Sequence, residues 1–137
     1  MENKIANFMF QRIGVPRFEK FLDLAAFRHK LISGNIANIT TPGYRGRDID
    51  FHAEFERLSG NGNHLAGKLT HAGHLPVGHH AACPPDVKEA KVSKGEMNAI
   101  DIDHEIASMA QNELQFSIGA KLLKSKLDGL RKAITSR

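Results

Sequence analysis

The sequence contains no tryptophan, one tyrosine and one cysteine in 137 residues. Its aromatic residues are unevenly placed, since none lies between Phe55 and Phe116, so a single core that draws on the whole chain is not expected. Cys83 has no partner for an internal disulfide, which argues against an oxidised scaffold. No apolar run reaches the roughly 18 residues of a membrane-spanning helix. Charges, Gly14 and Pro16 interrupt the first residues too often for a cleavable signal peptide.

The bulk composition is that of a folded, soluble chain with one domain or module. Hydrophobic residues make up 41% and charged residues 25% of the sequence. The formal net charge of +4 permits anionic partners but does not require them. Composition alone therefore leaves the function open.

The segment from about Pro16 to Thr40 has the spacing of an amphipathic helix. Pro16 suits a first helical turn, where its missing N–H is no loss. Apolar residues follow at alternating steps of four and three, which is a heptad pattern and predicts a helix about 35 Å long. This N-terminal seam consists of Phe18, Leu22, Ala25, His29, Ile32, Ile36 and Ile39, with His29 its one polar member.

The last part of the chain has a stronger pattern of the same kind. Asp101 is a plausible N-cap, and acids near the start and bases near the end complement the helix dipole. The alternation predicts a helix about 50 Å long, and its length without internal caps favours a coiled coil. This C-terminal seam consists of Ile102, Ile106, Met109, Glu113, Phe116, Ala120, Leu123, Leu127, Leu130 and Ile134, of which only Glu113 is polar.

These patterns predict a mainly α fold with three parts. Residues 1–58 hold the N-terminal helix, a joint and a short extended segment, and residues 99–137 hold the C-terminal coiled-coil helix. Residues 59–98 are rich in Gly, His and Pro and form an irregular, flexible insertion, with a short strand or turn between Val87 and Val92. The two terminal helices are expected to pair as an antiparallel coiled coil, which leaves apolar surface for other chains.

The joint between helix and insertion is the stretch NIANITTPGYRGRDIDF, residues 35–51. Asn35 and Asn38 share a helix face, and their amides can tie the last turn to a neighbouring backbone. The residue before Pro42 is pushed toward an extended conformation, so the helix ends near Thr41. Pro42-Gly43 suits the centre of a type II turn. From Arg47 to Phe51 alternation predicts an extended segment. On these grounds alone the motif is a helix stop followed by a turn.

The motif also resembles the signature of the bacterial flagellar axial proteins, the rod and hook family. That signature is Asn-x-Ala-Asn-x-x-Thr-Pro-Gly-Tyr, and within the family the proximal rod proteins are the most similar. The C-terminal part resembles the end of the same family at Ile102, Glu105, Met109, Ala110, Asn112 and Phe116, although the family commonly has tyrosine where Phe116 stands. The matching positions of the assembly signature are Asn35, Ala37, Asn38, Thr41, Pro42, Gly43 and Tyr44.

The resemblance implies a structural subunit of the proximal rod, with no cofactor and no enzymatic activity. Such a subunit is exported from the cytoplasm by the flagellar type III apparatus and polymerises in the periplasm into the helical drive-shaft tube of the basal body. Its implied partners are copies of itself, the second proximal rod protein, the junction protein between the MS ring and the rod, and the export apparatus. Nucleic acid and small-molecule substrates are not implied. Both seams would then pack between helices or between subunits.

Three other functions deserve comparison. A metal site at His71, His74, His79, His80 and Cys83 lacks paired ligand spacing and a rigid element. The bases Lys121, Lys124, Lys126, Arg131, Lys132 and Arg137 suggest a nucleic-acid-binding or adaptor helix, but a solvated basic face that complements the helix dipole explains them better. For an enzyme, Asp101 and Asp103 do not share a helix face, and the neighbours His104 and Glu105 have no nucleophile or phosphate loop beside them.

Overall fold

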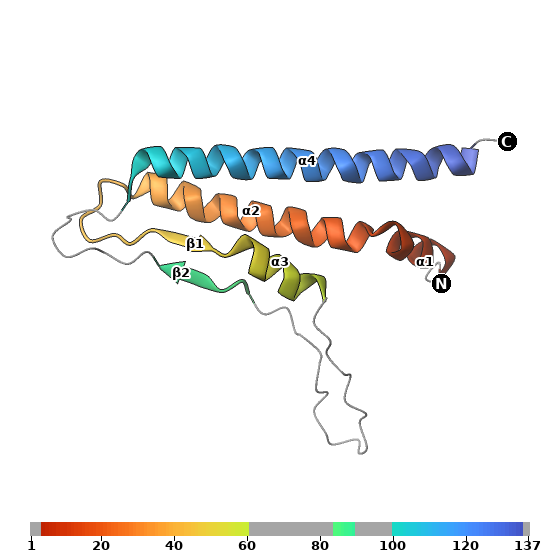
Figure 1. Ribbon diagram of the computed structural model, residues 1–137, viewed down its shortest axis with the longest axis horizontal. Coiled ribbons are helices and arrows are strands. Elements are labelled where there is room, and N and C mark those ends of the chain that lie inside the picture. The colour runs from red at the N-terminus through yellow and green to blue at the C-terminus, as the bar shows by residue number, and fades with distance from the viewer. Residues whose placement is uncertain (1–3, 61–83, 90–99, 136–137) are drawn as a thin grey trace, which may run out of the picture.

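The computed structural model describes residues 4–60, 84–89 and 100–135 (Figure 1). The described chain is mainly helical with long N- and C-terminal helices, as predicted. No helix among these residues has both the length and the apolar character needed to cross a membrane. The elements are α1 (Lys4–Ile13), α2 (Val15–Ala37), β1 (Arg47–Ile49), α3 (Phe51–Ser59), β2 (Val87–Glu89) and α4 (Ile102–Thr135).

Helices α2 and α4 lie side by side and run in opposite directions (Figure 1). The end of α2 meets the start of α4, where Asn35 donates to Glu105. Further along, Asn112 donates to the carbonyl of Ala25 on α2. The antiparallel arrangement was expected, whereas the supercoil of a coiled coil stays a prediction.

The N-terminal region contains one helix more than the sequence pattern indicated. Helix α2 begins at Val15, so Pro16 lies in its first turn as predicted. The separate helix α1 precedes it and was not anticipated. Gly14 links the two helices with a φ of 81°, a left-handed conformation that glycine adopts without steric cost. This residue breaks what would otherwise be one continuous helix.

The prediction that Phe51 continues an extended segment is wrong, because Phe51 begins α3. The Asp50 carboxylate caps this helix by accepting a hydrogen bond from the Ala53 backbone N–H at 3.2 Å. That hydrogen bond lowers the pKa of Asp50 below its ordinary value. Gly60 closes the helix with a φ of 73°. The Asp50 cap decides the conformation at Phe51, because the polar–apolar alternation that suggested a strand covers only a few residues.

Strands β1 and β2 pair antiparallel, with Asp48 opposite Lys88. The strand expected between Val87 and Val92 therefore exists as Val87–Glu89. It attaches residues from within the predicted insertion to the N-terminal region. The rest of that insertion lies outside the described residues, apart from 59–60 and 84–86.

The buried core lies mainly along α2. Leu24, Ala25 and Ile32 are at most 2% exposed, and Ile49 of β1 is buried beside them. An aromatic cluster extends this core toward α3, where the ring of Phe21 packs edge-on against Phe51 and Phe55 at 5.1 and 5.4 Å between centroids. These aromatics all come from the first part of the chain.

The contact between α2 and α4 depends on a small residue. Gly119 of α4 is buried, and a Cβ there would lie 2.9 Å from two ring carbons of Phe21 and 3.3 Å from Leu22. Because the Phe21 ring is held by two other rings, it cannot move aside easily. Gly119 therefore sets how closely the two helices approach.

We expect Gly119→Ala to lower the free energy of unfolding by about 1–2 kcal/mol, because overpacking against Phe21 exceeds the gain in helix propensity. Gly129→Ala on the same helix is the matched control, since nothing lies within 4 Å of a Cβ at that position. That control should gain up to about 1 kcal/mol. Urea denaturation of both variants tests the pair, and equal stabilisation by the two alanines would contradict close packing at Gly119.

Candidate assembly joint and helix face

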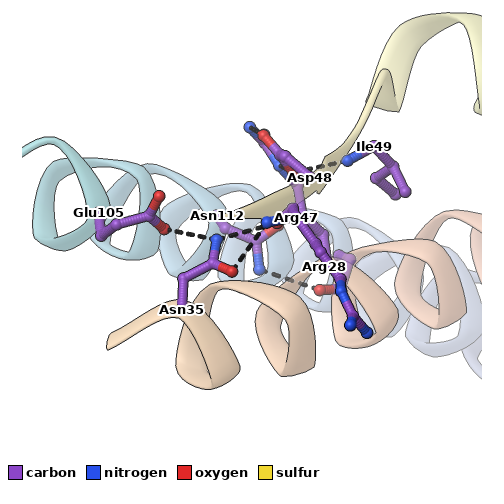
Figure 2. Close-up of polar contacts among 8 residues, drawn as sticks. Arg28, Asn35, Arg47, Asp48, Ile49, Glu105 and Asn112 are labelled. Atoms are coloured by element: carbon purple, nitrogen blue, oxygen red, sulfur yellow. Dashed lines mark hydrogen bonds and ion pairs between the residues drawn. The ribbon is translucent and has the colours of Figure 1, made fainter. Parts of the chain in front are cut away.

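Asn35 connects three elements of the fold through its side-chain amide (Figure 2). Its Nδ2 donates to the Arg47 carbonyl of β1 at 2.9 Å and to the Glu105 carboxylate of α4 at 3.1 Å. Its Oδ1 accepts from the Arg47 backbone N–H at 2.9 Å. The side chain is 1% exposed, so these bonds form away from water. Asn35, which belongs to α2, thus holds both β1 and α4 against α2.

A second link lies next to this amide on the same strand. The Arg28 guanidinium of α2 donates from Nε and Nη2 to the two carboxylate oxygens of Asp48, at 2.8 and 2.7 Å (Figure 2). This two-point bond raises the pKa of Arg28 above its ordinary value. Asp48 Oδ1 also accepts from the backbone N–H of Ile49. Together with Asn35, the ion pair fixes β1 against α2.

Asn38 has a different and more local role. Helix α2 ends at Ala37, before the predicted end near Thr41, and Asn38 is its C-cap. The Asn38 Nδ2 donates to the carbonyl of Gly34 at 2.8 Å, and its backbone N–H donates to the same carbonyl. The Asn38 side chain therefore satisfies a backbone carbonyl in the last turn of its own helix. The helix can thus end several residues before Pro42.

The predicted turn is present at residues 41–44. The Tyr44 backbone N–H donates to the Thr41 carbonyl at 3.2 Å, and Gly43 has a φ of 74°. With Pro42 in the second position, this geometry fits a type II turn. Ala37, Thr41, Pro42 and Gly43 are exposed, whereas Tyr44 is half-buried near Gly34. Within the signature, Asn35 is thus a buried hydrogen-bonding residue, Asn38 is a helix cap, and residues 41–43 form an exposed turn.

Helix α4 faces α2 with a stripe of polar and small residues. This inner stripe consists of Glu105, Asn112 and Gly119, which recur every seven residues. Asn112 is 1% exposed and donates to the Ala25 carbonyl at 2.9 Å. Its Oδ1 has no partner among the described residues. The inner stripe therefore selects one register of the helix pair through hydrogen bonds and a close approach.

Most of the C-terminal seam lies beside this inner stripe and is open to solvent. Ile106 is 52% exposed, Phe116 42% and Ile134 67%. Within the described chain these side chains are therefore left largely open to solvent, although Phe116 lines a shallow hollow beside Ala25 and His29 of α2. The other exposed members are Ile102, Glu113 and Leu127, and the half-buried members are Met109, Ala120, Leu123 and Leu130.

The side chains of the N-terminal seam are more buried than those of the C-terminal seam. Ala25 and Ile32 are buried in the core, while His29 is exposed. The remaining members are half-buried, namely Phe18, Leu22, Ile36 and Ile39. Since α2 ends at Ala37, Ile39 belongs to the joint and not to the helix.

The described geometry gives little support to the alternative metal and catalytic sites. His71, His74, His79, His80 and Cys83 lie outside the described residues. Among residues 4–60, 84–89 and 100–135, no group of three or more His, Cys, Asp and Glu side chains could hold a metal ion. Asp101 accepts a hydrogen bond from the Asp103 backbone N–H at 3.0 Å, which confirms it as the N-cap of α4.

Comparison with known proteins decides the family. No protein-family model matches the chain. The flagellar basal body rod protein FlgB of Salmonella typhimurium is 31% identical to it over 118 residues, 82% of this chain and 86% of that protein. The FlgB of Cereibacter sphaeroides is 37% identical over 114 residues, 82% of this chain and 87% of that protein. The chain belongs to the FlgB family.

The FlgB of Escherichia coli K12 extends the similarity, with 29% identity over 127 residues, 86% of this chain and 90% of that protein. These FlgB relatives are named for a structural assembly and not for a reaction. The prediction of a structural protein from the flagellar rod family is confirmed, and so is the prediction that it is not an enzyme.

Several residues that hold the joint or the α2–α4 helix pair were not singled out as site residues from the sequence. Arg28, Asp48 and Gly119 are examples, and Asn112 was noted only through its resemblance to the family. A signal for the inner stripe was present, because Glu105, Asn112 and Gly119 recur every seven residues beside the seam. The stripe is polar, so a search for apolar periodicity passes over it.

We expect Asn35→Asp to lower the free energy of unfolding by about 2–4 kcal/mol. The change removes the donor to the Arg47 carbonyl and sets a second carboxylate against Glu105. Burial and like charge raise the pKa of the new carboxyl, so the loss should be largest at neutral pH and smaller in acid. Adding Glu105→Gln should recover part of the stability at neutral pH. A loss that does not vary with pH would contradict the contact with Glu105.

We expect Gly43→Val to destabilise the joint by about 1–3 kcal/mol, because a β-branched residue resists positive φ. Gly43→Asn is the control, since asparagine tolerates this conformation at about 1 kcal/mol or less. Nothing lies within 4 Å of a Cβ at Gly43, so a difference between the variants reports backbone strain alone. Thermal unfolding measures both, and equal melting temperatures would argue against the turn.

Proposed function

We propose that this chain, a structural protein of the flagellar basal body rod, polymerises into the helical drive-shaft tube. It is exported from the cytoplasm by the flagellar type III apparatus and assembles in the periplasm. Its relatives are named as rod proteins, which supports the rod as its place of action. Heterologous contacts that do not close into a ring generate a helical filament, which is the geometry that a rod requires.

The observation that carries this proposal is the exposed C-terminal seam. A helix of 34 residues presents Ile106, Phe116 and Ile134 to solvent along one side. Exposed apolar residues spread along so long a helix are unfavourable in an isolated chain and mark an interaction surface. Covering it with neighbouring subunits removes the apolar area from water and stabilises the assembly. The seam is therefore the surface through which the subunits pack.

The joint has a supporting role in this proposal. Asn35 and the turn at Pro42-Gly43 hold the strand and α3 to one side of the paired helices (Figure 1). This leaves the C-terminal seam uncovered and gives every subunit the same outline. Two further signature positions, Ala37 and Thr41, lie exposed at or just after the end of α2, where a neighbour can reach them.

The partners follow from the resemblance to the rod and hook family. They are other copies of the chain, the second proximal rod protein, the junction protein between the MS ring and the rod, and the export apparatus. Nucleic acid is not a proposed partner, because DNA binding by the bases of α4 leaves the apolar seam unexplained.

The direct test is quantitative mass spectrometry of basal bodies purified from the source organism. The proposal expects the chain in a fixed ratio to other rod components. Its absence from basal bodies, with the chain recovered free in the cytoplasm, would overturn the proposal. Salt-sensitive retention of that free chain on DNA would then favour the basic-helix alternative.

We expect Ile106→Asp to reduce incorporation into basal bodies at least tenfold, because it places a charge in the C-terminal seam. Ile118→Asp is the matched control, since Ile118 is 49% exposed against 52% for Ile106 and lies outside the C-terminal seam. At about 100° per residue, the two side chains point roughly 120° apart. Both variants should keep the monomer's helix content by circular dichroism. Equal incorporation of the two variants would contradict the seam as the packing surface.

A further inference from the structure

Positive charge gathers at the end of the molecule where both chain termini lie (Figure 1). We call residues 4–20 and 121–135 the basic end. They contain nine lysines and arginines against two acids, whereas the other described residues contain six against eleven. Among the described residues, none of the nine bases forms an ion pair. The basic end therefore attracts an anionic partner.

Helix α1 gives the basic end an amphipathic element. At about 100° per residue, its five large apolar residues fall within roughly 200° of the helix circumference. Lys4, Asn7 and Gln11 share the opposite side, and α1 contains no acid. An apolar face on a short basic helix is typical of helices that lie on a membrane surface. The apolar residues are Ile5, Phe8, Met9, Phe10 and Ile13.

The side chain of Phe8 is the most exposed part of this face. It is 61% exposed, and Phe10 is exposed as well. The Arg12 guanidinium lies 5.7 Å from the centre of the Phe8 ring. An aromatic ring and a base thus stand together at the surface of the protein. A lipid interface accommodates both, because the ring enters the apolar layer while the guanidinium binds the phosphate of a headgroup.

The attachment of α1 leaves its surface accessible. Among the α1 side chains that the structure describes, none is buried, and the buried apolar core lies on α2 and β1. Gly14 joins α1 to α2, and nothing lies within 4 Å of the place where a Cβ would stand. Helix α1 can therefore meet a flat surface without disturbing the core.

We propose that α1 lies on an anionic lipid bilayer, with Phe8 inserted at the level of the headgroups and Arg12 bound to lipid phosphate. Each further base near the bilayer strengthens the attraction about fivefold. With its 10 residues, α1 rests on the bilayer and does not cross it. Nucleic acid would also be attracted by the bases, but its phosphate backbone offers no apolar layer for the apolar face of α1.

Tryptophan fluorescence tests the contact directly, because the chain contains no tryptophan. Phe8→Trp and Leu114→Trp are introduced separately into the full chain and mixed with vesicles of phosphatidylethanolamine and phosphatidylglycerol. Leu114 is the matched control, since it is 62% exposed but lies among the acids of α4. The emission of Phe8→Trp should move to shorter wavelength as the indole leaves water, and that of Leu114→Trp should not. No change for Phe8→Trp, or equal changes for both, would overturn the proposal.

Co-sedimentation with the same vesicles measures the affinity. Phe8→Ser should weaken binding about tenfold and Arg12→Gln about fivefold, with unchanged melting temperatures. Lys30→Gln removes an exposed base from the middle of α2 and should weaken binding by less than about twofold. Vesicles of phosphatidylcholine alone should bind the unaltered chain at least about tenfold more weakly. Equal binding to both kinds of vesicle, or retention on duplex DNA without binding to vesicles, would contradict a contact with anionic lipid.

Binding to vesicles and presence in purified basal bodies are separate measurements. A chain that is found in basal bodies but binds no vesicles would reject the lipid contact and leave the proposed rod function standing. A chain that binds vesicles through Phe8 but is absent from basal bodies would support the lipid contact and reject the rod function.

Discussion

The structure depends on the side-chain amide of Asn35. One buried amide donates to the Arg47 carbonyl and to Glu105, and accepts from the Arg47 N–H, so it joins α2, β1 and α4 at a single point. Leaving such groups buried without partners would cost about 1–3 kcal/mol each. The amide therefore tolerates only one placement of the strand and one rotation of α4.

That rotation divides α4 into two stripes with different roles. The inner stripe, with Asn112 donating to α2 and Gly119 against Phe21, fixes the helix pair within the chain. The C-terminal seam lies beside it and keeps residues such as Ile106 exposed. Polar contacts fix how α4 is set against α2, and under the proposed function the exposed apolar surface is available for association, where its burial removes apolar area from water.

The sequence predicted the long helices, the cap at Asp101 and the turn at Gly43, because each depends on local periodicity or on a residue with a narrow conformational range. It did not predict α3, since a short alternation from Arg47 to Phe51 masked the capping signal. It also did not indicate which stripe of α4 faces α2. That choice depends on hydrogen bonds between residues about 70 positions apart, such as Asn35 and Glu105, which no local pattern contains.

The central claim is that the C-terminal seam is exposed in the single chain and covered in the rod. Hydroxyl-radical footprinting of the free chain and of purified basal bodies measures this directly, residue by residue. The account predicts that Ile106 and Phe116 react readily in the free chain and are strongly protected in basal bodies, while buried Leu24 is protected in both. Equal reactivity of Ile106 and Phe116 in the two states would contradict it.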